Sequence, residues 1–215
     1  MKKLWLALWV CAALLPRAAA LSAAAAVTMD ADTGETLFAE NADSRLPMAS
    51  TTKIMTALVA LGEGGLDRVY TVKKQYAAVE GSSMYLEEGE RLTLRDTLYG
   101  LMLSSGNDAA AAVAGECGGE RAFVDKMNAK ARELGLTDTR FENPSGLPSD
   151  GHYTTARELA KITAAALRDP VFRDIVSTKT CTAAGRTLVN HNRLLSLYED
   201  AIGVKTGFTR AAGRG

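Results

Sequence analysis

The spacing of hydrophobic positions predicts a buried helix shortly after Pro47. Apolar residues recur there every three or four positions, which is the period of one helical face. Met55 and Val59 add apolar bulk to the other faces, so we expect this helix to be buried on nearly all sides. Glycines at positions 62, 64 and 65 end it. The helical spacing is carried by Ile54, Ala57, Leu58 and Leu61.

Four more segments carry helical signals. Residues 93–96, Thr-Leu-Arg-Asp, form a predicted capping box that opens a helix. The apolar face of that helix consists of Leu94, Leu98, Leu101 and Met102. It stops at residues 104–107, where small polar residues and a glycine interrupt the pattern. The other helices are expected over residues 108–115, 120–134 and 155–167.

Short runs near both ends of the chain predict strands. The first two, residues 25–29 and 35–39, are joined by Asp-Thr-Gly, a hairpin turn sequence. Residues 141–153 hold two prolines and two glycines and are expected to form a loop. The order of strands, helices and strands predicts an α+β domain, with a helical cluster inserted between parts of one antiparallel sheet. The C-terminal strands are expected over residues 178–182, 186–189 and 202–209.

Composition narrows the class of protein. The 215 residues include 25 basic and 25 acidic ones without a basic block, so an electrostatic case for nucleic-acid binding is absent. With only two histidines a histidine-based metal site is improbable, and no cofactor is predicted. Cys117 and Cys181 do not form a disulfide framework and are expected to be isolated, idle thiols.

The first twenty residues are typical of a secretory signal peptide. Lys2 and Lys3 give a positive start, residues 4–15 follow without a charge, and residues 18–20 are alanines that suit cleavage. An apolar run of this length is too short to span a bilayer, which takes about 20 residues. We therefore expect residues 1–20 to be a signal peptide and residues 21–215 to be exported, to the cell envelope or beyond it.

Ser50 and Lys53, at the front of the buried helix, could form a nucleophile and its base. Residues three apart share a helical face, so the lysine can reach back towards the serine. The positive end of a helix and burial both lower the pKa of a lysine, which makes an uncharged amine available to take the serine proton. The alternative is an ordinary N-cap serine and a surface lysine. This pair alone is a weak signal.

Two other motifs carry polar groups that could reach the same cleft. Residues 105–107, Ser-Gly-Asn, lie in the break between two helices, although these are also the usual residues of any helix–helix turn. Residues 205–207, Lys-Thr-Gly, follow an apolar run and are expected on a strand, where the glycine would let a substrate backbone approach closely. The alternative for this motif is an edge-strand lysine beside a turn.

Together the three motifs resemble those of the low-molecular-mass D-alanyl-D-alanine carboxypeptidases, which are penicillin-binding serine peptidases of the S11 type. They occur in the family's order and in helix, loop and strand contexts that suit each role. The similarity runs from about residue 24 to the last residue and implies the β-lactamase/D,D-peptidase-like fold. Longer segments that look like the family are residues 47–58, 81–86, 141–147 and 191–195.

The resemblance implies how a peptide bond would be cleaved. Ser50 would attack the carbonyl of the penultimate D-alanine and form an acyl-enzyme, while Lys53 accepts its proton. Ser105 would relay a proton to the leaving amine. The backbone N–H groups of Ser50 and Phe208 would form the oxyanion hole. No metal or organic cofactor is implied.

The resemblance also implies the partners and the groups that hold them. Asn107 would hold the substrate amide, and Lys205, assisted by Thr206 and Gly207, would bind the terminal carboxylate and help hold Ser105. The substrates would be peptidoglycan stem peptides that end in D-Ala-D-Ala. The β-lactam antibiotics would be covalent inhibitors.

Two features depart from the motif set and the family. The middle motif is Ser-Gly-Asn rather than Ser-Asp-Asn, which suits carboxypeptidases better than class A β-lactamases. Gly215 follows the third motif within ten residues, whereas family members continue through further sheet strands, and many add a membrane-binding helix. We therefore expect a C-terminally truncated catalytic domain, whose missing strands and any peripheral membrane anchor would follow residue 215.

Two alternative functions stay open at this point. A β-lactamase would share acylation at Ser50 but needs a carboxylate that activates water for rapid release. Glu142 is the only candidate for that carboxylate, and a simple loop residue is the better interpretation of it. A non-catalytic cell-wall or penicillin-binding module would keep the cleft without the chemistry.

Overall fold

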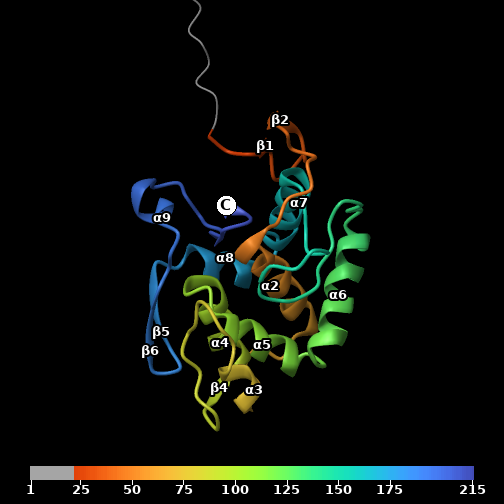
Figure 1. Cartoon of the computed structure of the whole chain (residues 1–215). Coiled ribbons are helices and arrows are strands. Elements are labelled where there is room, and N and C mark those ends of the chain that lie inside the picture. The colour runs from red at the N-terminus through yellow and green to blue at the C-terminus, as the bar shows by residue number, and fades with distance from the viewer. Residues whose placement is uncertain (1–21) are drawn as a thin grey trace, which may run out of the picture.

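The computed structural model describes residues 22–215 (Figure 1). The described chain begins with a hairpin, continues through most of its helices and ends in short strands. The described residues therefore contain both helices and antiparallel strands, which confirms the predicted α+β class. The predicted signal peptide, residues 1–20, lies outside the described residues.

Helix α2 (Thr52–Glu63) lies at the centre of the helical part, directly after a short 3₁₀ turn, η1 (Ala49–Thr51). Most of its side chains are buried, including the apolar ones on several faces. The prediction of a helix buried on nearly all sides is therefore confirmed. The helices that contact it are α4 (Leu94–Leu103), α5 (Asn107–Glu116), α6 (Glu120–Glu133), α7 (Ala156–Ala166) and α8 (Pro170–Ser177).

Side-chain caps fix where two of these helices begin. At α4, Thr93 Oγ1 accepts the N–H of Asp96 at 3.0 Å, and Asp96 Oδ2 accepts the N–H of Thr93 at 3.2 Å. At α7, Thr155 Oγ1 accepts the N–H of Glu158 at 3.1 Å. These contacts satisfy N–H groups that have no partner inside the helix. Both predicted helix starts are confirmed.

The strands form four separate antiparallel pairs within residues 22–215. The first pair packs against α7 and the third against α4 (Figure 1). Two short helices that the sequence did not predict, α3 (Lys74–Ala77) and α9 (Leu194–Leu197), lie between strands. The pairs are β1 (Ala26–Met29) with β2 (Thr36–Glu40), β3 (Val69–Thr71) with β4 (Arg91–Thr93), β5 (Thr180–Ala183) with β6 (Arg186–Val189), and β7 (Phe208–Thr209) with β8 (Gly213–Arg214).

The strand predicted over residues 202–209 is shorter than expected. Only Phe208 and Thr209 lie in a ladder, and Gly207 and Gly215 exchange two further hydrogen bonds of 2.9 Å. Residues 201–206 pair with no strand in the described part of the chain. The apolar sequence therefore predicts where the extended segment lies but not how much of it is a strand, because a strand also requires a hydrogen-bonded neighbour.

Neither cysteine of the described domain is in a disulfide. Cys117 is buried and Cys181 is partly buried, and both are free thiols. Burial raises the pKa of each thiol, which keeps it protonated and unreactive at neutral pH. Between residues 22 and 215, no helix combines the length and the apolar character that crossing a membrane requires.

Candidate active site

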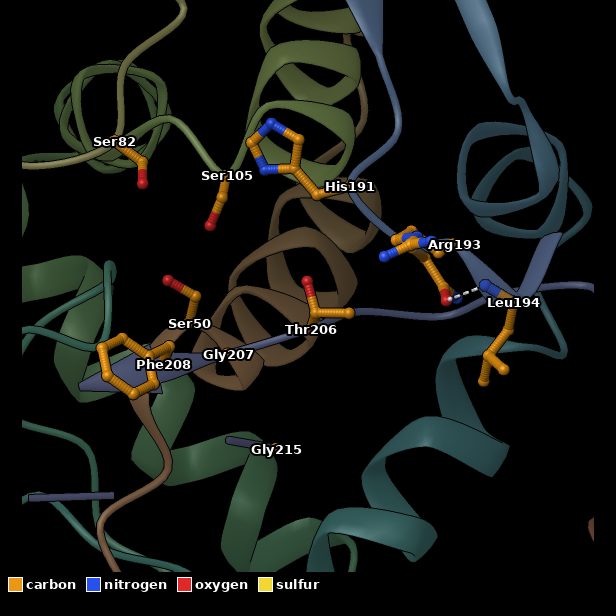
Figure 2. A pocket seen from close by; sticks show the side chains of 11 residues that line it. Ser50, Ser82, Ser105, His191, Arg193, Leu194, Thr206, Gly207, Phe208 and Gly215 are labelled. Carbon is orange, nitrogen blue, oxygen red and sulfur yellow. Dashed lines mark hydrogen bonds between the residues drawn. The ribbon is translucent and has the colours of Figure 1, made fainter. Parts of the chain in front are cut away.

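The three predicted motifs meet at one cleft beside the N-terminal end of α2 (Figure 2). The cleft has a volume of about 560 Å³. In Figure 2 the hydroxyls of Ser50 and Ser105 point towards each other across it. Its lining consists of Ser50, Ser82, Ser105, residues 191–194, residues 206–208 and Gly215.

Ser50 is not a helix cap. The N-cap of η1 is Met48 and that of α2 is Thr51, and neither makes a side-chain cap bond. The Ser50 side chain instead projects into the cleft (Figure 2). Ala49, directly before it, has a φ of 45°, a left-handed conformation that is costly for a residue with a Cβ. The backbone therefore turns sharply at the candidate nucleophile.

Lys53 is buried with three polar partners. Its exposed fraction is 0%, and its Nζ lies 2.6 Å from the carbonyl of Ser145, 2.8 Å from Asn107 Oδ1 and 3.2 Å from Ser50 Oγ. Burial, with a smaller contribution from the charge of Lys205, holds the pKa of this amine well below its usual value. The surface-lysine alternative is therefore wrong.

An uncharged Lys53 amine fits its surroundings as a base. It would carry two hydrogens and one lone pair. The Ser145 carbonyl and Asn107 Oδ1 can only accept hydrogen bonds, so they take the two hydrogens. The lone pair then faces Ser50 Oγ, which is where a proton acceptor for the serine hydroxyl is needed.

The amide of Asn107 is oriented by the loop between α3 and β4. Its Nδ2 donates to the carbonyl of Glu80 at 2.8 Å, so Oδ1 must be the atom that faces Lys53. The backbone N–H of Asn107 donates to the carbonyl of Ser82 at 2.7 Å. Asn107 is thus placed beside the lysine rather than in the cleft lining, and its predicted contact with a substrate amide stays a prediction.

Ser105 is held between α4 and α5 with a φ of 59°, and it is buried except where it faces the cleft. The next residue has to be a glycine. A Cβ on Gly106 would lie 2.6 Å from Asp108 Oδ1 and 3.2 Å from the backbone nitrogen of Met84. This crowding accounts for a Ser-Gly-Asn motif in this chain, where a side chain on the middle residue would displace Asp108.

The third motif, residues 205–207, borders the cleft on the side of Ser50 that lies across from Ser105. A Cβ on Gly207 would lie 3.2 Å from the backbone nitrogen of Ser50, so the extended segment passes close to the nucleophile. Burial lowers the pKa of Lys205 to about 8, and its Nζ donates to the carbonyl of Thr206 at 2.8 Å. Among residues 22–215 no hydrogen bond joins Lys205 to Ser105, so that predicted contact is not made in this conformation.

Glu142 lies in the 141–153 loop, away from the cleft lining. Its carboxylate accepts hydrogen bonds from the Ser149 hydroxyl and from the N–H of Gly151, and it pairs with Arg140 at 3.4 Å. It is a loop residue, as expected. Within the described range 22–215, no three histidine, cysteine, aspartate or glutamate side chains lie close enough to hold a metal ion.

Comparison with known proteins identifies the family. A family model described as D-alanyl-D-alanine carboxypeptidase matches residues 12–215. The chain belongs to this family. The D-alanyl-D-alanine carboxypeptidase DacF of Bacillus subtilis is 41% identical over 202 residues, which cover 88% of this chain and 52% of that protein. A D-alanyl-D-alanine carboxypeptidase of Streptomyces sp. is 40% identical over 210 residues, which cover 87% of this chain and 72% of that protein.

Solved structures of family members share the fold. A serine-to-alanine variant of a Streptomyces DD-transpeptidase matches with a TM-score of 0.88 at 39% identity, covering 92% of this chain and 85% of that one. The D-alanyl-D-alanine carboxypeptidase of Mycobacterium tuberculosis matches with a TM-score of 0.87 at 36% identity, covering 93% of this chain and 78% of that one. The implied D,D-peptidase-like fold is thereby confirmed. The chain spans about half the length of the Bacillus relative.

Sequence reasoning did not assign several residues that the structure places at or near this family site. Ser82, His191 and Arg193 line the cleft. The sequence signal for these residues is the similarity of segments 81–86 and 191–195 to the family. Asp108 was also missed, although it directly follows the second motif.

Proposed function

We propose that this protein is a serine D,D-carboxypeptidase, which removes the terminal D-alanine from peptidoglycan stem peptides through an acyl-enzyme on Ser50. The observation that supports this most is the Lys53 amine. It is fully buried, its pKa is lowered, two of its three partners can only accept hydrogens, and the third is Ser50 Oγ at 3.2 Å. Membership of the family supports the choice of substrate.

In the acylation step, Ser50 Oγ attacks the carbonyl carbon of the penultimate D-alanine and its proton moves to Lys53 Nζ. The negative charge on the carbonyl oxygen is stabilised by the N–H groups of Ser50 and Phe208. Ser105 gives its proton to the leaving nitrogen and is reprotonated by Lys53, so that the proton taken from Ser50 is passed on. The C–N bond breaks, the carbonyl re-forms as the Ser50 ester, and D-alanine departs. Water then attacks the ester, which regenerates the Ser50 hydroxyl and releases the shortened peptide.

Substrate recognition rests on the third motif. As an ammonium group, Lys205 has three donors, and one is used by the Thr206 carbonyl. Lys205 lines a neighbouring pocket beside Ala49 and Gly215 rather than the cleft itself, so its other donors would have to turn towards the substrate to bind the terminal carboxylate. The Thr206 hydroxyl already lies in the cleft to assist (Figure 2). Gly207 has no side chain, so an extended peptide can approach the segment. A β-lactam would acylate Ser50 in the same way.

Export follows from the same function, because peptidoglycan lies outside the cytoplasmic membrane. The predicted signal peptide over residues 1–20 supports it. Peripheral membrane association through a segment after residue 215, which the resemblance implies, stays a prediction.

The test combines a D-Ala-D-Ala peptide with a fluorescent penicillin. We expect the wild-type protein to release D-alanine and to form a penicillin adduct on the peptide that contains Ser50. The Ser50→Ala variant should do neither, while it keeps the wild-type melting temperature. A wild-type protein that binds the peptide, forms no adduct and releases no D-alanine would support the non-catalytic module instead.

The pH profile of the peptidase should show the charge state of Lys205. Its pKa is about 8, so the ammonium group is present below that pH and is lost as the pH rises through it. We therefore expect kcat/KM to fall above about pH 8, because the cation that binds the carboxylate disappears. In Lys205→Arg this alkaline limb should move beyond the measurable range, since a guanidinium stays charged.

His191 supplies the control for that profile. It lines the cleft, and burial followed by the charge of Lys205 lowers its pKa. A His191→Gln variant should keep the alkaline limb near pH 8. If the fall in kcat/KM above about pH 8 persists in Lys205→Arg, titration of Lys205 is not its cause.

A further inference from the structure

The carbonyl oxygen of Ala49 is held from two sides. On one side it accepts the backbone N–H of Thr52 and also the Thr52 hydroxyl, the latter at 2.8 Å, and on the other the loop that contains Gly146 packs directly against it. A Cβ on Gly146 would lie 1.8 Å from this oxygen, and the φ of 88° at Gly146 also favours glycine. The sharp backbone turn before Ser50 is therefore fixed by residues with no proposed role in the chemistry, Thr52 and Gly146.

The Thr52 hydroxyl is itself held by His152, a buried side chain with an exposed fraction of 4%. His152 Nδ1 accepts the backbone N–H of Glu142 at 3.0 Å, so Nδ1 carries no hydrogen. Nε2 then carries the hydrogen and donates it to Thr52 Oγ1, 2.7 Å away. The three hydrogen bonds therefore run in one direction, from the Glu142 N–H through His152 and Thr52 to the Ala49 carbonyl.

The environment of His152 favours this neutral form. Burial lowers the pKa of its imidazole to about 4, so it is uncharged at neutral pH. Both ring nitrogens are engaged, and the side chain is not in the lining of the cleft around Ser50. His152 is therefore placed to orient other groups rather than to exchange protons with a substrate.

The Ala49 carbonyl and the Ser50 N–H belong to one planar trans peptide group and point in opposite directions. Because the carbonyl oxygen is held towards Thr52, the Ser50 N–H points away from Thr52. On that other side the third motif approaches, because a Cβ on Gly207 would lie 3.2 Å from the Ser50 nitrogen. This N–H is one of the two proposed oxyanion donors, and such donors act by being oriented before the reaction.

We propose that His152 is a positioning residue, which fixes the Ser50 N–H in the oxyanion hole by holding the Ala49 carbonyl through the Thr52 hydroxyl. The inference rests on the proposed function. It predicts that breaking this series of hydrogen bonds weakens stabilisation of the tetrahedral state and leaves ground-state binding of the peptide nearly unchanged.

The test removes the Thr52 hydroxyl with little change in shape. Complete loss of an oxyanion donor costs about a hundredfold or more in kcat, so a misaligned donor in Thr52→Val should cost about ten- to a hundredfold. KM for a D-Ala-D-Ala peptide should change by less than about threefold. The affinity for a peptide boronic acid, which mimics the tetrahedral state on Ser50, should fall by the same factor as kcat.

Thr97 provides a matched control. Its hydroxyl is also buried, lies 2.7 Å from the Tyr70 hydroxyl, and donates to the Thr93 carbonyl at 2.8 Å. Thr97→Val therefore removes an equivalent pair of hydrogen bonds away from the cleft, and should lower the melting temperature without changing kcat or boronate affinity. Thr52→Ser, which keeps the hydroxyl, should restore both to within about threefold of wild type.

His152 variants complete the test. His152→Ala should lower kcat by the same factor as Thr52→Val. The double variant should lower kcat little further, because both changes break the same series of hydrogen bonds. Unchanged kcat and boronate affinity in Thr52→Val, or losses equal to those of Thr97→Val, would overturn the proposal. A wild-type protein without penicillin labelling would instead remove the proposed function, and this inference with it; labelling that depends on Ser50 leaves the variants to decide.

Discussion

Replacing Lys53 with methionine is expected to lower the rate of Ser50 acylation by about a thousandfold. A positioned general base contributes typically about 10² to 10⁴ in rate, and Lys53 is the amine within reach of Ser50 Oγ, at 3.2 Å. Methionine keeps the length and volume of the buried side chain but cannot accept a proton. The measurement is the second-order rate constant for labelling by a fluorescent penicillin.

The pH dependence of the same rate separates a lost base from a damaged cleft. Because burial lowers the pKa of Lys53, the wild-type amine is uncharged above that lowered value and becomes charged as the pH falls through it. Wild-type acylation should therefore fall about tenfold per pH unit on the acid side. The residual rate of Lys53→Met should lack this limb. A folded Lys53→Met protein that acylates within tenfold of wild type would contradict the assignment.

Features set by neighbouring residues were predictable from the sequence. The helical spacing after Pro47 identified α2, and Thr93 and Asp96 identified the start of α4, because both signals depend on contacts within one turn. The same holds for Ser50 and Lys53, which share a helical face. Family resemblance supplied the second and third motifs.

Features set by distant contacts were not predictable in this way. The carbonyl of Ser145 and the amide of Asn107 bind Lys53 from 92 and 54 residues away, and nothing local marks either contact. The role of His152 is equally hidden in the sequence, because its hydrogen bond to Thr52 spans 100 residues. The strand expected over residues 202–209 is shorter than predicted, Phe208–Thr209, for the related reason that strand length depends on a partner elsewhere in the chain.

Asp108 organises the cleft edge from a position outside the cleft lining. It is almost fully buried at the start of α5, where the helix dipole favours a negative charge. Every hydrogen bond recorded for its carboxylate is accepted from a donor. They come from the Ser83 hydroxyl at 2.6 Å and from the N–H groups of Met84 at 3.0 Å, Leu86 at 3.0 Å and Ala109 at 2.8 Å. One side chain therefore holds the loop that carries Ser82 against the helix that carries Asn107.

Asp108→Asn is expected to lower the free energy of unfolding by about 3 kcal/mol. The amide would turn hydrogen-bond donors towards backbone donors that have no other partner, and each buried group left unsatisfied costs about 1–3 kcal/mol. For a domain of this size the melting temperature should fall by about 6–12 °C. Penicillin acylation should fall as well, because Asn107 and its contact with Lys53 depend on the same loop.

Glu158 is the control for that result. It is buried too, and it accepts the N–H groups of Thr137 and Asp138 and the Thr139 hydroxyl, at a place outside the cleft lining. Glu158→Gln should therefore lower the melting temperature by a similar amount and leave the acylation rate of the folded protein unchanged. If the two variants lose acylation equally once folding is accounted for, Asp108 acts through global stability alone. Loss confined to Asp108→Asn ties the cleft edge to the reactivity of Ser50, since Asp108, unlike Glu158, holds the loop whose carbonyls bind Asn107 and, through it, the amine of Lys53.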